Sequence, residues 1–211
     1  MNANPLRALA WALLAMTLAA CSGSLLPKPD ATPALYTLGA PVAAPQRPAP
    51  AGAPTLLIAP PRPAPGHDSR LIAYQRQPQR LDYFAHSEWV DTPAALLAPL
   101  VARAAQDTGA FGAVLLAPTT AAADARLELE QLRVLQDFST SPSQVHLSVQ
   151  AVLVDVLTRR VRASQSFEAH APSPSEDAAG GAAAAQQAAR ELARALAAFC
   201  AAQALPAPKG R

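Results

Sequence analysis

The sequence predicts an α+β domain in which a mostly antiparallel sheet carries two main helices, behind an N-terminal stem. Three observations support this prediction. Residues 126–169 hold three successive runs in which apolar and polar residues alternate, as in half-buried strands. Segments 92–108 and 182–205 instead place apolar residues at helical spacing. An apolar N-terminal run and a proline-rich stretch precede all of these elements.

Composition indicates a modest core and narrows the function classes. Apolar residues make up 51% of the 211 residues, but many are alanine and aromatics reach only 5%. Alanine buries little area, so scattered larger residues must supply most of the core. A net charge of +2 with thinly spread basic residues favours no nucleic-acid partner.

Residues 1–20 have the features of a secretory signal peptide. Arg7 precedes an apolar run of about 11 residues, which is too short for a membrane span of roughly 20 residues. The four residues that end the run resemble the bacterial lipobox, whose cysteine is linked to diacylglycerol before cleavage: Leu18, Ala19, Ala20 and Cys21. We therefore expect lipidation at Cys21. The alternative is an ordinary signal peptide with a chance cysteine.

Sorting and the stem follow from the residues after the cysteine. Ser22 stands where an aspartate often signals retention at the inner membrane, so the sorting rule implies an outer-membrane anchor facing the periplasm. Residues 21–34 are polar and proline-bearing, and are expected to form an extended stem. With Cys21 lipidated, Cys200 has no partner in the chain. We interpret it as a small buried thiol, with an intermolecular disulfide as the alternative.

Four short strands are expected before the first helix. Leu35 to Leu38 form the first, followed by a proline-rich loop, and residues 55–59 form the second. Residues 70–76 and 79–84 have strand composition on either side of a break at Pro78.

Four residues of this region are candidate partner contacts: Tyr74, Arg76, Tyr83 and Trp89. Tyrosine, tryptophan and arginine are enriched at binding hot spots. The aromatic ones could equally be packing residues at the edge of the core. The residue pattern alone leaves both readings open.

The first helix has clear start and stop signals. Thr92 can cap it, Pro93 suits its first turn, and Gly109 can end it after Thr108. A short strand, 113–116, follows. In the next strand the apolar parity slips at Glu130, which predicts a β-bulge.

Two further strands, at 145–154 and 161–169, complete an antiparallel meander. Val152, Leu153 and Val154 are expected to be covered on both sheet faces, and Val161 to point inward. Residues 172–181 are expected to break the pattern before an alanine-rich helix from Ala182. The domain is therefore expected to span 35–205, with a disordered tail at 206–211.

No catalytic, phosphate-binding or metal-ligand motif is present. The four histidines are far apart in sequence, and His86 and His146 have the pattern of surface residues. We therefore predict a protein that is not an enzyme and that uses no cofactor and no metal.

The order of segments resembles a known family. The lipobox is followed by LYTL, RLIAYQRQPQRLDYFAHSEWVDTP, GAFGAVL, LELEQLRV, VHLSVQAVLVD and an alanine-rich helix. This arrangement is similar to the ABC-type transport auxiliary lipoproteins (PqiC/YmbA-like) from Leu35 to about Ala204. Two departures stand out. Gln75 separates Tyr74 from an arginine that is often adjacent to it in the family, and the turn near Arg159 lacks the usual glycine.

The resemblance implies a non-catalytic outer-membrane lipoprotein of an intermembrane lipid transport system. Its expected partners are an MCE-domain (MlaD-like) protein and, indirectly, an ABC permease and ATPase. The resemblance also favours docking to a partner over core packing as the role of the candidate contacts. It is compatible with a homo-oligomer. The alternative function is a structural or assembly lipoprotein that supports an outer-membrane protein or envelope complex.

Overall fold

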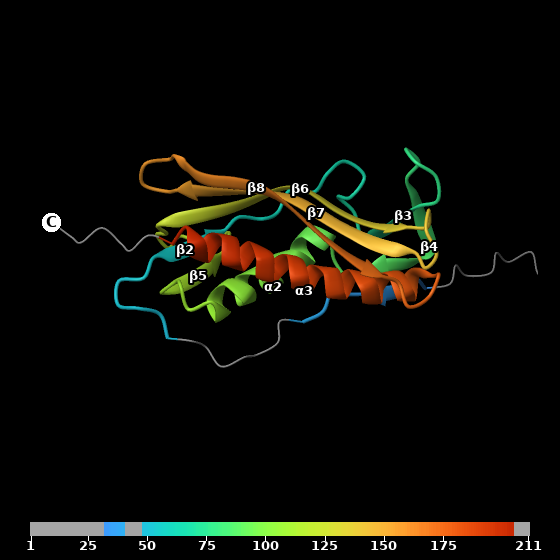
Figure 1. Cartoon of the computed structure of the whole chain (residues 1–211), viewed down its shortest axis with the longest axis horizontal. Coiled ribbons are helices and arrows are strands. Elements are labelled where there is room, and N and C mark those ends of the chain that lie inside the picture. Colours follow the sequence, from blue (N-terminus) through green and yellow to red (C-terminus); the bar gives the residue numbers. More distant parts are fainter. Residues whose placement is uncertain (1–31, 41–47, 205–211) are drawn as a thin grey trace, which may run out of the picture. The chain divides into compact units, whose positions relative to one another are not determined.

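The computed structural model describes residues 32–40 and 48–204. These residues form the following elements in chain order: β1 (Ala34–Tyr36), β2 (Thr55–Ile58), β3 (Leu71–Gln75), β4 (Asp82–Trp89), α2 (Pro93–Asp107), β5 (Ala113–Leu116), β6 (Ala125–Asp137), β7 (Gln144–Asp155), β8 (Val161–Pro172) and α3 (Ala178–Ala202). Helices α2 and α3 lie side by side against the sheet (Figure 1). The predicted α+β class with two packed helices is confirmed. No helix of the described residues is long and apolar enough to cross a membrane.

The sheet is mixed. The long strands β6, β7 and β8 form the antiparallel meander that the alternation predicts. The short strands β3 and β4 form an antiparallel hairpin. The other pairings of the shorter strands are parallel: β1 with β4, β2 with β5, and both β2 and β3 with β6. Because β2 and β3 pair with opposite ends of β6, the 13-residue strand β6 organises the whole sheet.

The predicted β-bulge is present in β6. Its register with β7 shifts between Glu130 and Arg133, and Gln131 adopts a φ of 56°. The bulge moves one residue out of the pairing. As a result Leu127 and Leu129 before it, and Leu132 after it, all face the core with at most 1% exposure.

Three predictions, about one strand end and about the burial of two strand segments, are wrong. The second hairpin strand is β4, which begins at Asp82 and continues to Trp89 instead of ending at Phe84. Val161 is 60% exposed and does not point inward. Val152 and Val154 are only half-buried, so this end of β7 is covered on one face.

Helix α3 begins at Ala178, four residues earlier than expected. Asp177 caps it by accepting the N–H of Gly180 at 2.8 Å. The two glycines of its first turns permit close packing, because a Cβ on Gly181 would collide with the side chain of Gln136. The two glycines predict a break in the pattern here. Instead they lie inside the helix, because there is no room for a Cβ at Gly181 next to Gln136.

The core lies between the sheet and the two helices. Its large members come mainly from the sheet and α2, and α3 contributes mostly alanine. Cys200 is 1% exposed within α3, which agrees with the expected buried thiol, and burial raises the pKa of this thiol to about 12. Arg159, in the β7–β8 turn, adopts a φ of 56°, a left-handed conformation that glycine adopts more readily.

Candidate functional site

The predicted lipidation site lies outside the described residues. This applies to Cys21, to the lipobox residues Leu18, Ala19 and Ala20, to most of the expected stem and to the 206–211 tail. These assignments stay predictions. The four candidate contacts, in contrast, all lie in the described β3–β4 hairpin.

Tyr74 and Arg76 belong to one surface cluster at the end of β3. The Tyr74 ring lies 4.6 Å from the Phe84 ring and 5.7 Å from the Phe138 ring, measured between centroids. The Arg76 guanidinium carbon lies 5.5 Å from the centroid of Tyr74 and 5.1 Å from that of Phe138. These distances are within the range of cation–π contacts. We call Tyr74, Arg76, Phe84 and Phe138 the aromatic–arginine cluster.

The backbone fixes this cluster from three strands. Tyr74 pairs with Asp82 of β4 and with Gln136 of β6. Since alternate residues of a strand share a face, Phe84 and Phe138 lie on the same side as Tyr74. The sequence analysis missed Phe84 and Phe138 as members, because Phe138 is 54 or more residues away from the other three and only the β3–β6 pairing brings it close.

A hydrogen-bond network on the other face of the sheet supports the cluster. The Gln75 side chain donates to Asp137 at 2.9 Å, and the Ser139 N–H donates to the same carboxyl group at 2.8 Å. Desolvation acts to raise the pKa of Asp137, but these hydrogen bonds outweigh it and the net pKa is lowered. The ionised Asp137 thus ties β3 to β6 directly beside the cluster.

Tyr83 points to the opposite side of the hairpin from Tyr74. Tyr74 pairs with Asp82 and shares its face, and Tyr83, the next residue in the strand, lies on the other face. Its hydroxyl donates to the Gly66 carbonyl at 2.8 Å, and the residue is 37% exposed. Tyr83 therefore cannot contact the same partner surface as the aromatic–arginine cluster unless that partner wraps around the hairpin.

Trp89 is a core residue, which corrects its assignment as a candidate contact. It is 2% exposed, and its backbone N–H donates to the Arg70 carbonyl at 2.7 Å. The Arg70 side chain in turn donates to the Trp89 carbonyl at 2.9 Å. A large aromatic ring at the end of β4 is better buried than exposed, and packing here outweighs docking.

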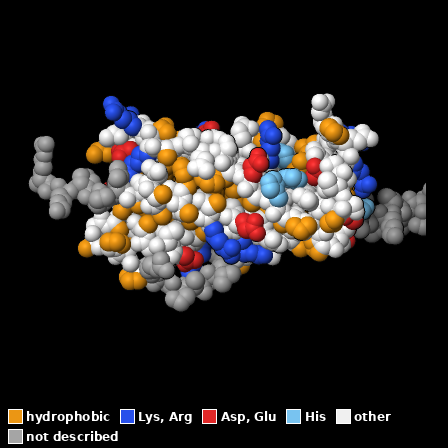
Figure 2. Space-filling view, in the orientation of Figure 1, with side chains coloured by type: hydrophobic (Ala, Val, Ile, Leu, Met, Phe, Trp, Pro, Cys, Tyr) orange, Lys and Arg blue, Asp and Glu red, His pale blue; other side chains and the backbone are white. Residues whose placement is uncertain are grey.

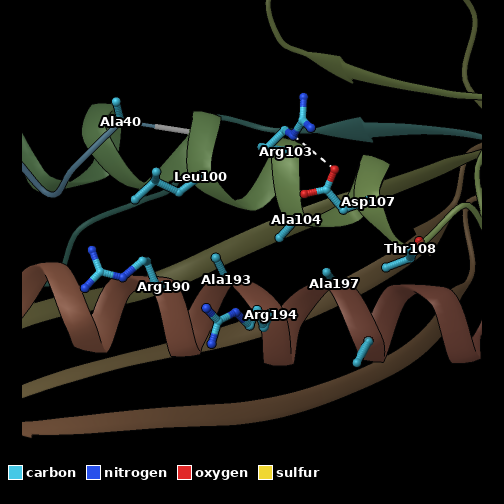
Figure 3. Close-up of a pocket in the computed structure, with 11 residues that line it drawn as sticks. Ala40, Leu100, Arg103, Ala104, Asp107, Thr108, Arg190, Ala193, Arg194 and Ala197 are labelled. Carbon is cyan, nitrogen blue, oxygen red and sulfur yellow. Dashed lines mark ion pairs between the residues drawn. The ribbon is translucent and has the colours of Figure 1, made fainter. Parts of the chain in front are cut away.

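A second surface feature is a groove between α2 and α3, with a volume of about 450 Å³. Its floor is formed by small or apolar side chains, and its rims carry charge (Figure 3). The lining residues are Ala40, Leu100, Arg103, Ala104, Asp107, Thr108, Arg190, Ala193, Arg194, Ala197 and Ala198. We call this feature the α2–α3 groove.

The two rims of the α2–α3 groove differ in their charge balance. On α2, Arg103 forms an ion pair with Asp107 at 3.0 Å. On α3, Arg190 and Arg194 form no ion pair with any carboxylate of the described residues. Figure 2 shows a small group of basic side chains beside α3 on this face. The sequence analysis did not single out either arginine, although their spacing of four residues in a helix was a usable signal.

The histidines make one contact that their sequence positions did not suggest. His146 of β7 pairs with His170 of β8, and their Nδ1 atoms lie 2.8 Å apart. His86 is exposed on β4, as the sequence analysis expected. In the part of the chain that the structure describes, no group of three or more ligating side chains could hold a metal ion.

Solved structures share this fold. A protein from Xanthomonas campestris, of the DUF330 family, is 26% identical, and the match covers 82% of this chain and 94% of that one with a TM-score of 0.65. An uncharacterised protein is 11% identical over 81% of this chain and 99% of its own length, with a TM-score of 0.60, and shows the fold alone. No match was found among curated proteins.

The family model described as "ABC-type transport auxiliary lipoprotein component" matches residues 36–197. This range covers β2 to β8, α2 and most of α3, and it agrees with the resemblance carried by the LYTL and Tyr74–Trp89 segments. The family is one of auxiliary components of a transport system, associated with the cell envelope. The chain belongs to the ABC-type transport auxiliary lipoprotein component family.

Proposed function

We propose that the protein is a non-catalytic outer-membrane lipoprotein that docks an MCE-domain (MlaD-like) assembly of an intermembrane lipid transport system. The family match over residues 36–197 carries this proposal. The Leu-Ala-Ala-Cys sequence that ends at Cys21 supports a lipid anchor, and Ser22 after it supports sorting to the outer membrane. An ABC permease and ATPase are the indirect partners.

The aromatic–arginine cluster is the contact surface that we assign to this docking. Rigid aromatic rings offer contact area at a low entropy cost, and tyrosine and arginine are frequent at the centres of interfaces. The exposed Arg76 forms no ion pair with any carboxylate in the described ranges, so its charge is free to meet an acidic group of a partner. Stacking on two rings holds the guanidinium in place before binding.

Copurification from membranes tests the docking. Tagged wild-type protein is expected to recover an MCE-domain protein, and the double variant Tyr74→Ala with Arg76→Ala is expected to recover at least tenfold less. Arg160→Ala is the matched control, because Arg160 is an exposed arginine on the β7–β8 turn, far from the cluster in the sheet. Circular dichroism of each variant verifies that the fold is retained.

Two results would count against the proposal. Wild-type bait that recovers no MCE-domain protein rejects the docking partner, and recovery of an outer-membrane barrel protein instead would support the assembly role. Equal recovery by the double variant rejects the aromatic–arginine cluster as the contact.

The anchor is tested separately. Cys21→Ser is expected to move the protein out of the outer-membrane fraction, because no acyl chain can then be attached. Retention of this variant in that fraction would reject lipidation as the anchor.

A further inference from the structure

The α2–α3 groove has features that docking through the hairpin does not use. Its floor brings together small and apolar side chains of both helices, including Leu100, Ala104, Ala193 and Ala197. Because alanine side chains are short, the two helices leave an open apolar trough of about 450 Å³ between them. This volume falls in the range of small-molecule sites, and such sites combine an apolar lining with a few polar groups.

The charged groups of the groove are concentrated on one rim. Arg190 and Arg194 are four residues apart in α3, so their guanidinium groups are neighbours on one helix face, and like charges at this spacing repel. Within the described residues neither forms an ion pair, and Arg190 makes only a long 3.4 Å hydrogen bond to Gln186. Across the groove, the Arg103 charge is already balanced by Asp107 at 3.0 Å.

An apolar trough beside two uncompensated arginines is complementary to one kind of ligand. The trough suits an aliphatic chain, and the arginine pair suits an anion with several oxygen acceptors, since guanidinium groups bind phosphate and carboxylate with paired hydrogen bonds. We propose that the α2–α3 groove binds an anionic amphiphile, with its aliphatic chain along the alanine floor and its phosphate or carboxylate head group at Arg190 and Arg194.

The proposal deepens the transport role, because it names a ligand class, and in that respect it rests on the proposed function. The residues that support the groove proposal are nevertheless different from the hairpin residues that support docking. Figure 3 shows the two arginines on α3 and the Arg103–Asp107 pair on α2, on opposite sides of the groove. None of these residues belongs to the aromatic–arginine cluster.

A thiol placed in the groove gives a direct readout. Ala104 lines the groove and is half-buried, so Ala104→Cys is expected to react with a maleimide when the groove is empty. The native Cys200 is buried and gives little background. The assay uses the full-length protein in nanodiscs of zwitterionic lipid. The probes are decyl phosphate, decanoate, decanol and inorganic phosphate.

The expected result is slower alkylation, by about tenfold, with decyl phosphate or decanoate. The comparison between these two probes identifies the preferred head group. Decanol lacks the charge and inorganic phosphate lacks the chain, so neither is expected to protect the thiol. Arg190→Gln combined with Arg194→Gln is expected to raise the half-protecting concentration of the better probe at least tenfold, and Arg160→Gln is expected to leave it unchanged.

Three results would overturn the proposal. Equal protection by decanol would show that the charge of the probe does not contribute to binding. Full protection of the double glutamine variant would show that Arg190 and Arg194 do not contribute to binding. Slow alkylation without any probe, unaffected by all four, would show that another part of the chain already covers the groove. If wild-type bait recovers no MCE-domain protein but the better anionic probe still protects the thiol, the docking proposal alone is rejected. If the partner is recovered but neither anionic probe protects the thiol, only the groove proposal is rejected.

Discussion

Gly181→Ala should destabilise the domain, although alanine is the better helix former. Gly181 lies in the first turns of α3, directly over Gln136 of β6, and an added Cβ would collide with the Gln136 side-chain carbonyl. Gln136 is 2% exposed, and its amide donates to Ser143 at 3.0 Å and to Ser173 at 3.4 Å. The methyl group can be accommodated only if this buried amide moves and its hydrogen bonds weaken.

The magnitude follows from opposing effects. Overpacking a core costs about 1–3 kcal/mol, and each weakened hydrogen bond costs about 1 kcal/mol. The higher helix propensity of alanine offsets about 1 kcal/mol of this. The net loss in the free energy of unfolding is therefore about 2–4 kcal/mol, which lowers the Tm by about 4–16 °C in a domain of this size.

Thermal and urea unfolding of four variants test this reasoning. Gln136→Ala makes room for the methyl group, so Gly181→Ala should cost at least about 1 kcal/mol less in that background than in the wild type. Ala183→Gly, at an exposed position of the same helix, is the control and should cost about 1 kcal/mol from propensity alone. A stabilising Gly181→Ala, or strict additivity of the two substitutions, would refute the clash.

Three further predictions concern other parts of the fold. Thr92→Ala should lower the free energy of unfolding by about 1 kcal/mol, measured in urea, because the Thr92 hydroxyl accepts an N–H of the first turn of α2 at 3.3 Å. The pKa of Asp155 is lowered from 3.8 to about 2 by the Thr158 N–H and by Arg162. Its stabilising contribution is therefore complete above about pH 5 and is lost as the pH falls through about 2, so Asp155→Asn should be less stable than wild type at pH 7, and most of this difference should be gone at pH 2. Equal stability of the two proteins at pH 7 would contradict this. Finally, native Cys200 should resist iodoacetamide at pH 8 and react after unfolding, because burial raises the pKa of its thiol to about 12. Rapid labelling of the folded protein would contradict its burial.

Periodicity predicted the elements whose pattern arises within one segment. The α2 cap at Thr92, the meander of β6 to β8 and the bulge at Gln131 all follow from local spacing. The α3 start at Ala178 does not, because the reason for Gly181 is its closeness to Gln136, which lies in the distant strand β6. Composition marks a glycine pair as a break unless the packing partner is known.

The candidate site shows the same limit. Tyr74 and Arg76 are close in sequence and lie together in the structure, as a local pattern can indicate. Trp89 has the composition of a hot-spot residue, yet its position at the buried end of β4 was set by pairing with β1, through Tyr36. The α2–α3 groove lies between two helices far apart in sequence, so only the tertiary structure reveals it.

The alanines of α3 constrain how this sequence can change during evolution. Five of its buried positions away from the α2–α3 groove hold alanine at 0–4% exposure: Ala182, Ala184, Ala185, Ala188 and Ala189. A methyl group at these positions is the largest side chain that fits without displacing the helix, because packed interiors resist added volume. In a saturation library, enlarging these alanines should therefore be selected against more strongly than exchanging leucine for methionine in the same core. These alanines contribute little to the hydrophobic composition, yet they are among the positions that tolerate substitution least.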